Sequence, residues 1–256
     1  MDLHLKGKRA IVLGGTRGIG RAIAETLAGE GADIAVCARN ADQVEEAVAA
    51  LRKTGVRATG AAVDIAKGED LKIWVGEVAK TFGGIDILIS NASALTMGAH
   101  PEAWEQLLKI DVLGAVNAFE AARPHLEKSA ADSGDASAVF ISSVSAAETQ
   151  AGNAYGAIKA ALIHYAKGLA REFAKRRVRV NVVSPGTIYF KGGVWHMIEQ
   201  NMPDRYNASM KANPTGRMGT PQEIANAAVF LASPASSFTT GANLIVDGAI
   251  TQRVNF

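Results

Sequence analysis

The 256-residue chain lacks the features that mark several protein classes. It has one cysteine, Cys37, which excludes an internal disulfide and a metal site built from several cysteines. Its formal net charge is only +2 at pH 7, and no basic stripe follows the pattern of a nucleic-acid-binding protein. No apolar run approaches about 20 residues and the first nine residues are mostly polar, so we expect neither a transmembrane helix nor a signal peptide. These absences favour a cytoplasmic protein.

Hydrophobic residues make up 48% of the chain, which is enough for a large core. Short apolar runs alternate with longer helical patterns from end to end, as in sheets whose parallel strands are joined by helices. Right-handed crossovers through these helices produce a doubly wound sheet, and no linker interrupts the pattern. We therefore expect a single α/β domain over residues 1–256, a Rossmann fold with a doubly wound seven-stranded parallel sheet. The expected strands are 10–13, 34–38, 61–63, 85–89, 138–141, 178–183 and 244–246.

Two segments interrupt this rhythm. Residues 128–136 are small and polar, and we expect a loop there. Residues 188–214 form a longer insertion that contains Trp195, Met197 and Tyr206. Long insertions in compact domains are often functional, so we interpret this one as a mobile lid over a mostly apolar substrate pocket. An ordered surface excursion is the alternative.

A glycine-rich segment follows the first expected strand and opens a helical pattern. Glycine permits a tight turn and the close approach of a pyrophosphate, and a helix N-terminus supplies oriented N–H donors. The position of this segment between a strand and a helix favours dinucleotide binding over a simple turn. The residues expected to bind are Gly14, Thr16, Arg17, Gly18, Ile19 and Gly20.

The end of the second strand indicates which dinucleotide binds. An NAD site usually has an acidic residue there, which accepts hydrogen bonds from the ribose hydroxyls. This chain has Ala38-Arg39-Asn40 instead, and Arg39 and Arg17 could both reach a 2′-phosphate. We therefore predict NADP(H). The alternative is that both arginines are solvated surface residues.

Tyr155 and Lys159 are four residues apart in a helical pattern, which places the phenol and the ammonium group on one face. A nearby positive charge favours the phenolate, so the pair can donate or accept a proton. This spacing alone is common on helix surfaces. It gains weight from the polar residues that close three preceding strands, namely Asp64, Asn91-Ala92 and Ser142-Ser143.

In this order the motifs resemble the short-chain dehydrogenase/reductase family over essentially the whole chain, and most broadly its 3-oxoacyl-[acyl-carrier-protein] reductase-like branch. Pro185-Gly186 and Val246-Asp247-Gly248 extend the resemblance toward the C-terminus. It implies an enzyme that transfers a hydride between the nicotinamide of NADP(H) and a ketone or secondary alcohol. Family members also act on steroids, polyols, sugars or small cyclic ketones. The resemblance further implies a homotetramer or a homodimer.

The resemblance assigns roles to residues of this sequence. Tyr155 would be the general acid and base, Lys159 would hold the nicotinamide ribose, and a serine would hydrogen-bond the substrate oxygen. The strand end favours Ser143, whereas counting back the spacing usual in the family from Tyr155 gives Ser142. The further residues expected at the cofactor are Asn40, Asp64, Ile65, Asn91, Ala92, Pro185, Gly186 and Ile188.

Two departures from the family pattern concern the site. Phe190 stands where the family commonly has a threonine near the nicotinamide amide, which puts one cofactor hydrogen bond in question. Asp111 stands where the family usually has an asparagine, whose backbone carbonyl joins a water-mediated proton relay. A carboxylate near Lys159 could offset the charge that makes Tyr155 acidic.

A protein that binds NADP(H) without turnover is a second interpretation. Such a protein would need no proton donor, so the presence of Tyr155 and Lys159 argues against it. The histidines are scattered, so no metal site is expected.

Overall fold

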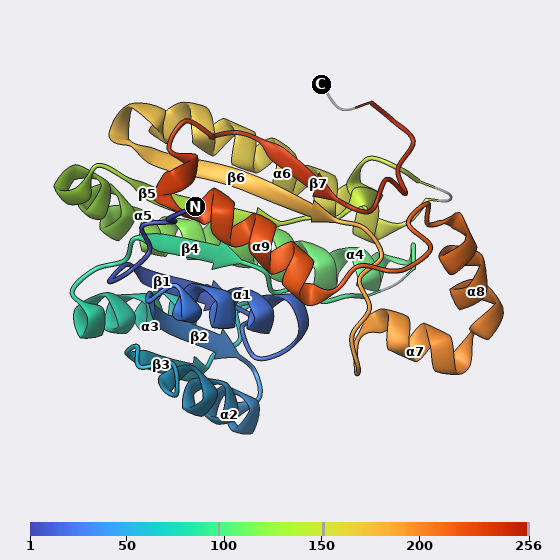
Figure 1. Cartoon of the computed structure of the whole chain (residues 1–256), viewed down its shortest axis with the longest axis horizontal. Coiled ribbons are helices and arrows are strands. Elements are labelled where there is room, and N and C mark those ends of the chain that lie inside the picture. Colours follow the sequence, from blue (N-terminus) through green and yellow to red (C-terminus); the bar gives the residue numbers. More distant parts are fainter. Residues whose placement is uncertain (97, 150–151, 255–256) are drawn as a thin grey trace.

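In the computed structural model, which describes residues 1–96, 98–149 and 152–254, seven parallel strands form one sheet (Figure 1). The strands are β1 (Arg9–Leu13), β2 (Asp33–Ala38), β3 (Ala58–Ala62), β4 (Ile87–Ser90), β5 (Ala136–Ile141), β6 (Val178–Pro185) and β7 (Asn243–Val246). They lie in the order β3-β2-β1-β4-β5-β6-β7. The order reverses between β1 and β4, which confirms the predicted doubly wound Rossmann fold.

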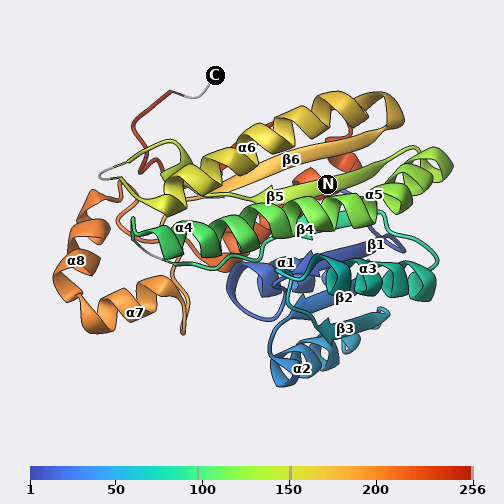
Figure 2. The same ribbon diagram turned by 180° about the vertical axis from the view of Figure 1, so that it is seen from behind.

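Helices cover both faces of the sheet. One face carries α1 (Gly18–Gly29), α2 (Ala41–Arg52) and α9 (Pro221–Ala232), as Figure 1 shows. The other carries α3 (Gly68–Phe82), α5 (Gly114–Ser133) and α6 (Ala154–Phe173), which are in front in Figure 2. The short helices α4 (Pro101–Leu107), α7 (Val194–Asn201) and α8 (Pro203–Ala212) lie toward the carboxyl ends of the strands. Among the described helices, none has the length and apolar character needed to cross a membrane.

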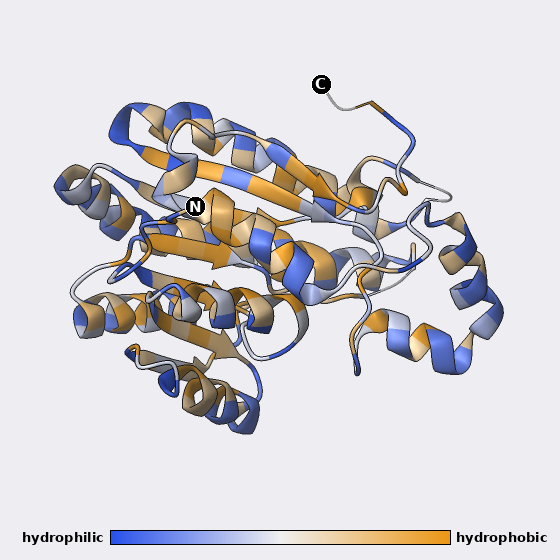
Figure 3. Cartoon of the chain, viewed as in Figure 1, coloured by the Kyte–Doolittle hydropathy of each residue, from blue (hydrophilic) through white to orange (hydrophobic). Residues whose placement is uncertain are grey.

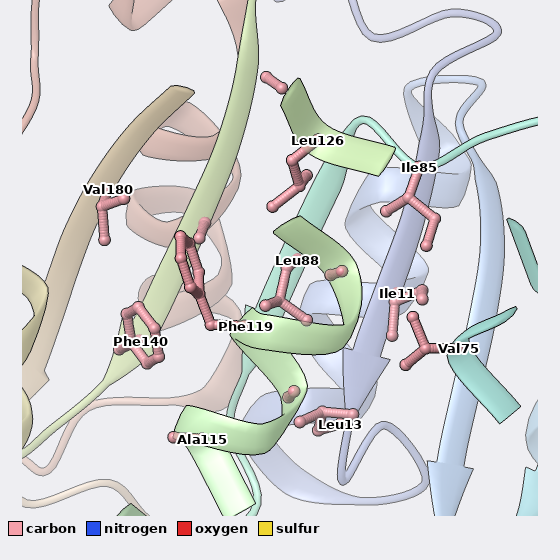
Figure 4. Close-up of a cluster of buried hydrophobic side chains, with 14 of the residues drawn as sticks. Ile11, Leu13, Val75, Ile85, Leu88, Ala115, Phe119, Leu126, Phe140 and Val180 are labelled. Atoms are coloured by element: carbon pink, nitrogen blue, oxygen red, sulfur yellow. The ribbon is translucent and has the colours of Figure 1, made fainter. Parts of the chain in front are cut away.

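The strands are continuous aliphatic runs because the helices bury both of their faces. Successive side chains point to opposite sides, so Val12 packs with α1, α2 and α9 while Ile11 and Leu13 pack with α3, α5 and α6. Figure 4 shows the second of these layers, where Phe119 of α5 lies beside Leu88 of β4. The two packed layers hold the strands in place and thus position the residues at the carboxyl edge.

Five of the expected strands differ from the structure by one or two residues at one end, and the other two are displaced along the chain. The expectation of 61–63 for the third strand is wrong, because Ala58–Ala62 pairs in register with Ile34–Ala38 of β2. The fourth strand runs over Ile87–Ser90 rather than 85–89. In both cases the pairing with the neighbouring strand, which the local pattern does not show, decides the bounds.

The loop expected over 128–136 is also wrong. Helix α5 continues to Ser133, and β5 begins at Ala136. Ala130 is fully buried in the core, and Lys128 forms an ion pair with Asp132 one turn further along the helix. The helix ends where Gly134 takes up a left-handed conformation with φ 85°. Burial of this last turn therefore outweighs its polar composition.

Residues 188–214 form an arm with two helices, α7 and α8. These helices pack on each other and extend away from the sheet beyond the carboxyl ends of the strands (Figure 1). The strands are hydrophobic in Figure 3, whereas α8 is largely hydrophilic. Met197 and Met202 in this arm are about half exposed, at 51% and 49%. The expected insertion thus forms a helical arm beside the edge where the predicted site lies.

Candidate active site

The predicted site residues gather at the carboxyl edge of the sheet. Gly14 follows β1, Asn91 follows β4, Ser143 follows β5 and Gly186 follows β6. Helix α6 begins at the same edge and brings Tyr155 there. In an open sheet of this kind, the crevice beside the strand-order reversal is where ligands bind.

The glycine-rich segment packs closely on the loop that follows β4. Gly14 has φ 69°, and a Cβ built on it would lie 3.1 Å from Cα of Ala92. A Cβ on Gly20 would collide with the carbonyl oxygen of Gly14, which accepts a hydrogen bond from Asn91 Nδ2 at 3.1 Å. Within the described residues, the side chain of the N-cap residue Arg17 makes no capping hydrogen bond to α1. Its first N–H groups can therefore bind an anion such as a pyrophosphate.

A polar cleft lies next to this loop and has a volume of about 440 Å³. Its lining residues are Arg39, Asp64, Ala66, Ala94, Gln106, Lys109 and Ile110. Arg39 is exposed, so its guanidinium can face an anionic ligand here. Asn40 instead caps α2, since its Oδ1 accepts a hydrogen bond from Gln43 N at 2.9 Å. Sequence reasoning missed Gln106 and Lys109, which come from a distant segment and carry no local signal.

Tyr155 and Lys159 do share one face of α6. Asn153 caps this helix, and the Nζ atom of Lys159 lies 5.6 Å from the centroid of the Tyr155 ring. Nζ also donates a hydrogen bond to the carbonyl oxygen of Ile141, at the end of β5, at 3.1 Å. Lys159 is 2% exposed, so its ammonium group is held inside the protein beside the phenol.

Asp111 lies within a π-helical turn, Leu108–Leu113, that connects α4 and α5. Its Oδ1 atom is 3.0 Å from Lys159 Nζ, and its Oδ2 accepts a hydrogen bond from Ala94 N at 2.8 Å. Within the described part of the chain, Oδ1 accepts no hydrogen bond of good geometry, so its contact with Lys159 is an ion pair. An asparagine could serve only one of these two partners as an acceptor, whereas a carboxylate serves both.

The surroundings of Lys159 favour its charged form. Burial alone would lower the pKa of Lys159, but the neighbouring Tyr155 and Asp111 outweigh it, and the pKa lies above the usual value for lysine. π-Helical turns occur often at functional sites. The structure thus brings Asp111 to the Tyr155–Lys159 pair, where the sequence suggested that it could lie.

The two candidate serines have different partners. Ser142 is 3% exposed, and its Oγ donates a hydrogen bond to the carbonyl oxygen of Lys159 at 2.9 Å. The Oγ of Ser143 accepts a hydrogen bond from Ser145 N at 3.1 Å. A hydroxyl that accepts in this way can still donate its own proton to a ligand. The geometry therefore supports Ser143 as the serine that faces a substrate.

The other predicted residues shape the edge mainly through packing. Ile65 contacts the Gly114 position, and Gly186 approaches Asp247 closely. Pro185 and Ile188 are buried, Ile19 is partly buried, and Oγ1 of Thr16 lies 3.5 Å from Gln43 Oε1. The Nη1 atom of Arg17 is 3.5 Å from the carbonyl oxygen of Gly192 in the arm.

A family model described as enoyl-(acyl carrier protein) reductase matches residues 14–251. Isoepoxydon dehydrogenase patN from Penicillium expansum is 38% identical over 251 residues, which are 96% of this chain and 95% of that protein. The chain belongs to the short-chain dehydrogenase/reductase family. It is therefore an oxidoreductase of the kind that acts on CH–OH groups, as the motifs predicted.

Two solved structures of this family are also similar. L-Sorbose reductase from Gluconobacter frateurii, complexed with NADPH and L-sorbose, matches with a TM-score of 0.90 and 32% identity over 99% of this chain and all of that one. A 7α-hydroxysteroid dehydrogenase complexed with NADH matches with a TM-score of 0.89 and 30% identity, covering 99% of this chain and 98% of that one. These relatives share the fold, but they differ in cofactor and substrate.

Proposed function

We propose that the chain is an NADP(H)-dependent oxidoreductase that interconverts a ketone and a secondary alcohol, with Tyr155 as its proton donor. One observation carries this proposal: the phenol of Tyr155 and the buried ammonium of Lys159 share a helix face at the edge where the glycine-rich loop ends. The positive charge favours loss of the phenol proton. A proton donor thus lies beside a site suited to a dinucleotide.

The residues present fit NADP(H). The uncapped N-terminus of α1 provides N–H donors for the pyrophosphate, and Arg39 and Arg17 provide guanidinium groups for the 2′-phosphate. When bound, the nicotinamide would supply the hydride. The NADPH complex of L-sorbose reductase supports this choice, while the NADH complex of the steroid dehydrogenase shows that family resemblance alone does not decide it.

In the direction of reduction, the carbonyl carbon of the substrate receives the hydride and its oxygen gains negative charge. Tyr155 Oη then gives its proton to that oxygen, and Ser143 Oγ donates a hydrogen bond that stabilises the charge. Lys159 stabilises the phenolate that remains on Tyr155. The products are a secondary alcohol and an oxidised cofactor, and the tyrosine regains its proton from water.

The arm over 188–214 serves in this proposal as the substrate lid. Its half-exposed Met197 and Met202 offer an apolar surface near the carboxyl edge. The family model is described by an acyl-carrier-protein substrate, and 33% identity over 98% of this chain with a 3-oxoacyl-[acyl-carrier-protein] reductase from Chlamydia pneumoniae supports the 3-oxoacyl branch. The compounds after which two relatives are named, isoepoxydon and L-sorbose, support the alternative of a sugar or a small cyclic ketone.

We further infer a single domain over residues 1–256, a cytoplasmic location and a homotetramer or homodimer. Family resemblance supports these three inferences. Analytical ultracentrifugation of the purified protein would measure the oligomeric state.

The proposal is tested by following NADPH consumption against a panel of 3-oxoacyl thioesters, sugars, steroids and small cyclic ketones. We expect turnover of at least one carbonyl compound, with kcat/KM higher for NADPH than for NADH. In Arg39→Ser this preference should fall by about tenfold or more, because a charge-assisted contact to phosphate is lost. Tight binding of NADPH with no turnover of any carbonyl would support the sensor instead, and a clear NADH preference would refute the cofactor assignment.

A further inference from the structure

The ring of Phe190 lies on the glycine-rich loop. Gly18 is the first residue of α1 and has φ 54°. A Cβ built on Gly18 would collide with Cζ of the Phe190 ring and would lie 2.8 and 2.9 Å from Cε2 and Cε1. The ring therefore fills the space that the missing side chain of Gly18 leaves open.

Two other glycines of the loop, Gly14 and Gly20, differ from Gly18. The missing side chains of Gly14 and Gly20 make room for neighbouring parts of the site itself, namely Ala92, Asn91 and the backbone of Gly14. Only at Gly18, among these three, is the space filled by a side chain from the distant arm. In dinucleotide sites, a glycine at the start of the helix leaves room for the pyrophosphate to approach the backbone. The ring and a pyrophosphate would thus need the same space.

Further contacts connect this part of the arm to the loop. Gly193, which precedes α7, donates a hydrogen bond from its N–H to the carbonyl oxygen of Phe190 at 2.9 Å. A Cβ on Gly193 would lie 2.7 Å from Cε1 of the same ring, so the ring packs closely on both Gly18 and Gly193. Arg17 Nη1 reaches the carbonyl oxygen of Gly192 at 3.5 Å. The start of the arm is therefore seated on the N-terminus of α1.

We propose that Phe190 is a gate on the dinucleotide site, whose ring must leave Gly18 before the pyrophosphate can bind. This proposal rests on the proposed NADP(H) function. When only a fraction of the molecules can bind, the apparent Kd equals the intrinsic Kd divided by that fraction. If about a tenth of the molecules have the ring displaced, removing the ring strengthens NADPH binding by about tenfold.

The test compares two ligands on the full chain by isothermal titration calorimetry. NADPH needs the space at Gly18, whereas 2′-AMP has the 2′-phosphate and the adenosine but no pyrophosphate. We expect Phe190→Ala to lower the Kd for NADPH by about tenfold and to leave the Kd for 2′-AMP unchanged. Phe190→Leu should give a smaller change. Phe238→Ala is the matched control, because Phe238 is fully exposed and its removal should change neither Kd.

The result distinguishes this proposal from the proposed function. If the wild type binds both ligands and Phe190→Ala binds NADPH equally well or more weakly, the ring is a packing residue and the gate is refuted. If the 2′-AMP affinity changes by the same factor as the NADPH affinity, the ring acts on the whole site and the gate is also refuted. If the wild type binds neither ligand, the proposed NADP(H) function itself fails, and the gate fails with it.

Discussion

Both edges of the sheet hold an ion pair with a buried cation, but the two pairs are hydrogen-bonded to different extents. At the amino edge, Arg179 donates to both carboxylate oxygens of Asp135, at 2.6 and 3.0 Å, and also to Leu231 O and Ser236 Oγ. At the carboxyl edge, Lys159 pairs with Asp111 at 3.0 Å without a hydrogen bond of good geometry. All three guanidinium nitrogens of Arg179 donate hydrogen bonds, whereas the contact between Lys159 and Asp111 is an ion pair alone.

This difference indicates different roles. A buried ion pair must offset the cost of removing two charges from water, and additional hydrogen bonds make that possible. Arg179 has such bonds and joins β6 to the end of α9, so we interpret its pair as structural. Lys159 has one carbonyl partner besides Asp111, and its ammonium group lies beside Tyr155. We interpret this second pair as part of the chemistry.

The largest expected effect is that of Tyr155→Phe. Removing the phenol oxygen should lower kcat by about 10³-fold, since general acid catalysis is lost, and leave the Kd for NADPH nearly unchanged. Steady-state kinetics and cofactor titration measure the two quantities. Tyr165→Phe on the same helix is the matched control and should keep wild-type kcat. Full activity of the Tyr155→Phe variant would show that Tyr155 is not the proton donor.

Arg179→Met tests the other side of the comparison. It leaves Asp135 without its partner, and we expect the free energy of unfolding to fall by about 3 kcal/mol. Denaturant unfolding measures this change. The folded fraction of the variant should keep wild-type kcat, because Arg179 lies at the amino edge. A selective loss of kcat in fully folded Arg179→Met would contradict the division between the two edges.

The serines offer a finer test within the carboxyl edge. Ser143→Ala should lower kcat by about 10²-fold, the usual effect of losing one donor to a developing oxyanion. Ser142→Ala removes a hydrogen bond to the backbone of α6, so it should reduce stability by about 1 kcal/mol with a smaller effect on kcat. Activity and unfolding assays on both variants measure the contrast. The reverse pattern would make Ser142 the catalytic serine.

Asp111→Asn should have the smallest effect on rate and a clear effect on pH dependence. Without the carboxylate, the Lys159 charge acts on Tyr155 without compensation, and the rising limb of kcat/KM for alcohol oxidation should move about one unit toward lower pH. A pH–rate profile of both proteins measures this shift. An unchanged profile would mean that Asp111 has no influence on proton transfer.

The same pair predicts how stability depends on pH. The pKa of Lys159 is raised in the folded protein, so its contribution to stability is complete below the pKa of an unfolded lysine and is lost as the pH rises through the folded value. The stability difference between wild type and Asp111→Asn should therefore be present at neutral pH and decrease in strong alkali. Urea unfolding at several alkaline pH values measures it.

Much of the fold could be predicted from the sequence, because buried parallel strands appear as aliphatic runs and right-handed crossovers through the helices produce a doubly wound sheet. The end of α5 could not, since the burial of Ala130 depends on the tertiary core. The π-helical turn at Leu108–Leu113 has no local signature either. It is formed where two helices join and places Asp111 against Lys159.

The positions of the site residues could be predicted where a local motif sets their spacing. They could not be predicted where segments far apart in the chain come into contact. Local spacing was enough to place Tyr155 and Lys159 on one face. The sequence favours Ser143 over Ser142, and this stays a prediction, which the hydrogen bond from Ser142 to the α6 backbone supports. The ring of Phe190 on Gly18 joins segments far apart in the chain, and no local pattern indicates it.

The central claim is hydride transfer between NADP(H) and a carbonyl carbon at the carboxyl edge. It is tested most directly by incubating the protein with NADPH that carries deuterium on the transferable C4 position and with a carbonyl compound, followed by mass spectrometry of the product. We expect one deuterium on the carbinol carbon for each NADPH consumed. NADPH bound but not consumed with any carbonyl compound, or an alcohol without deuterium, would contradict the account.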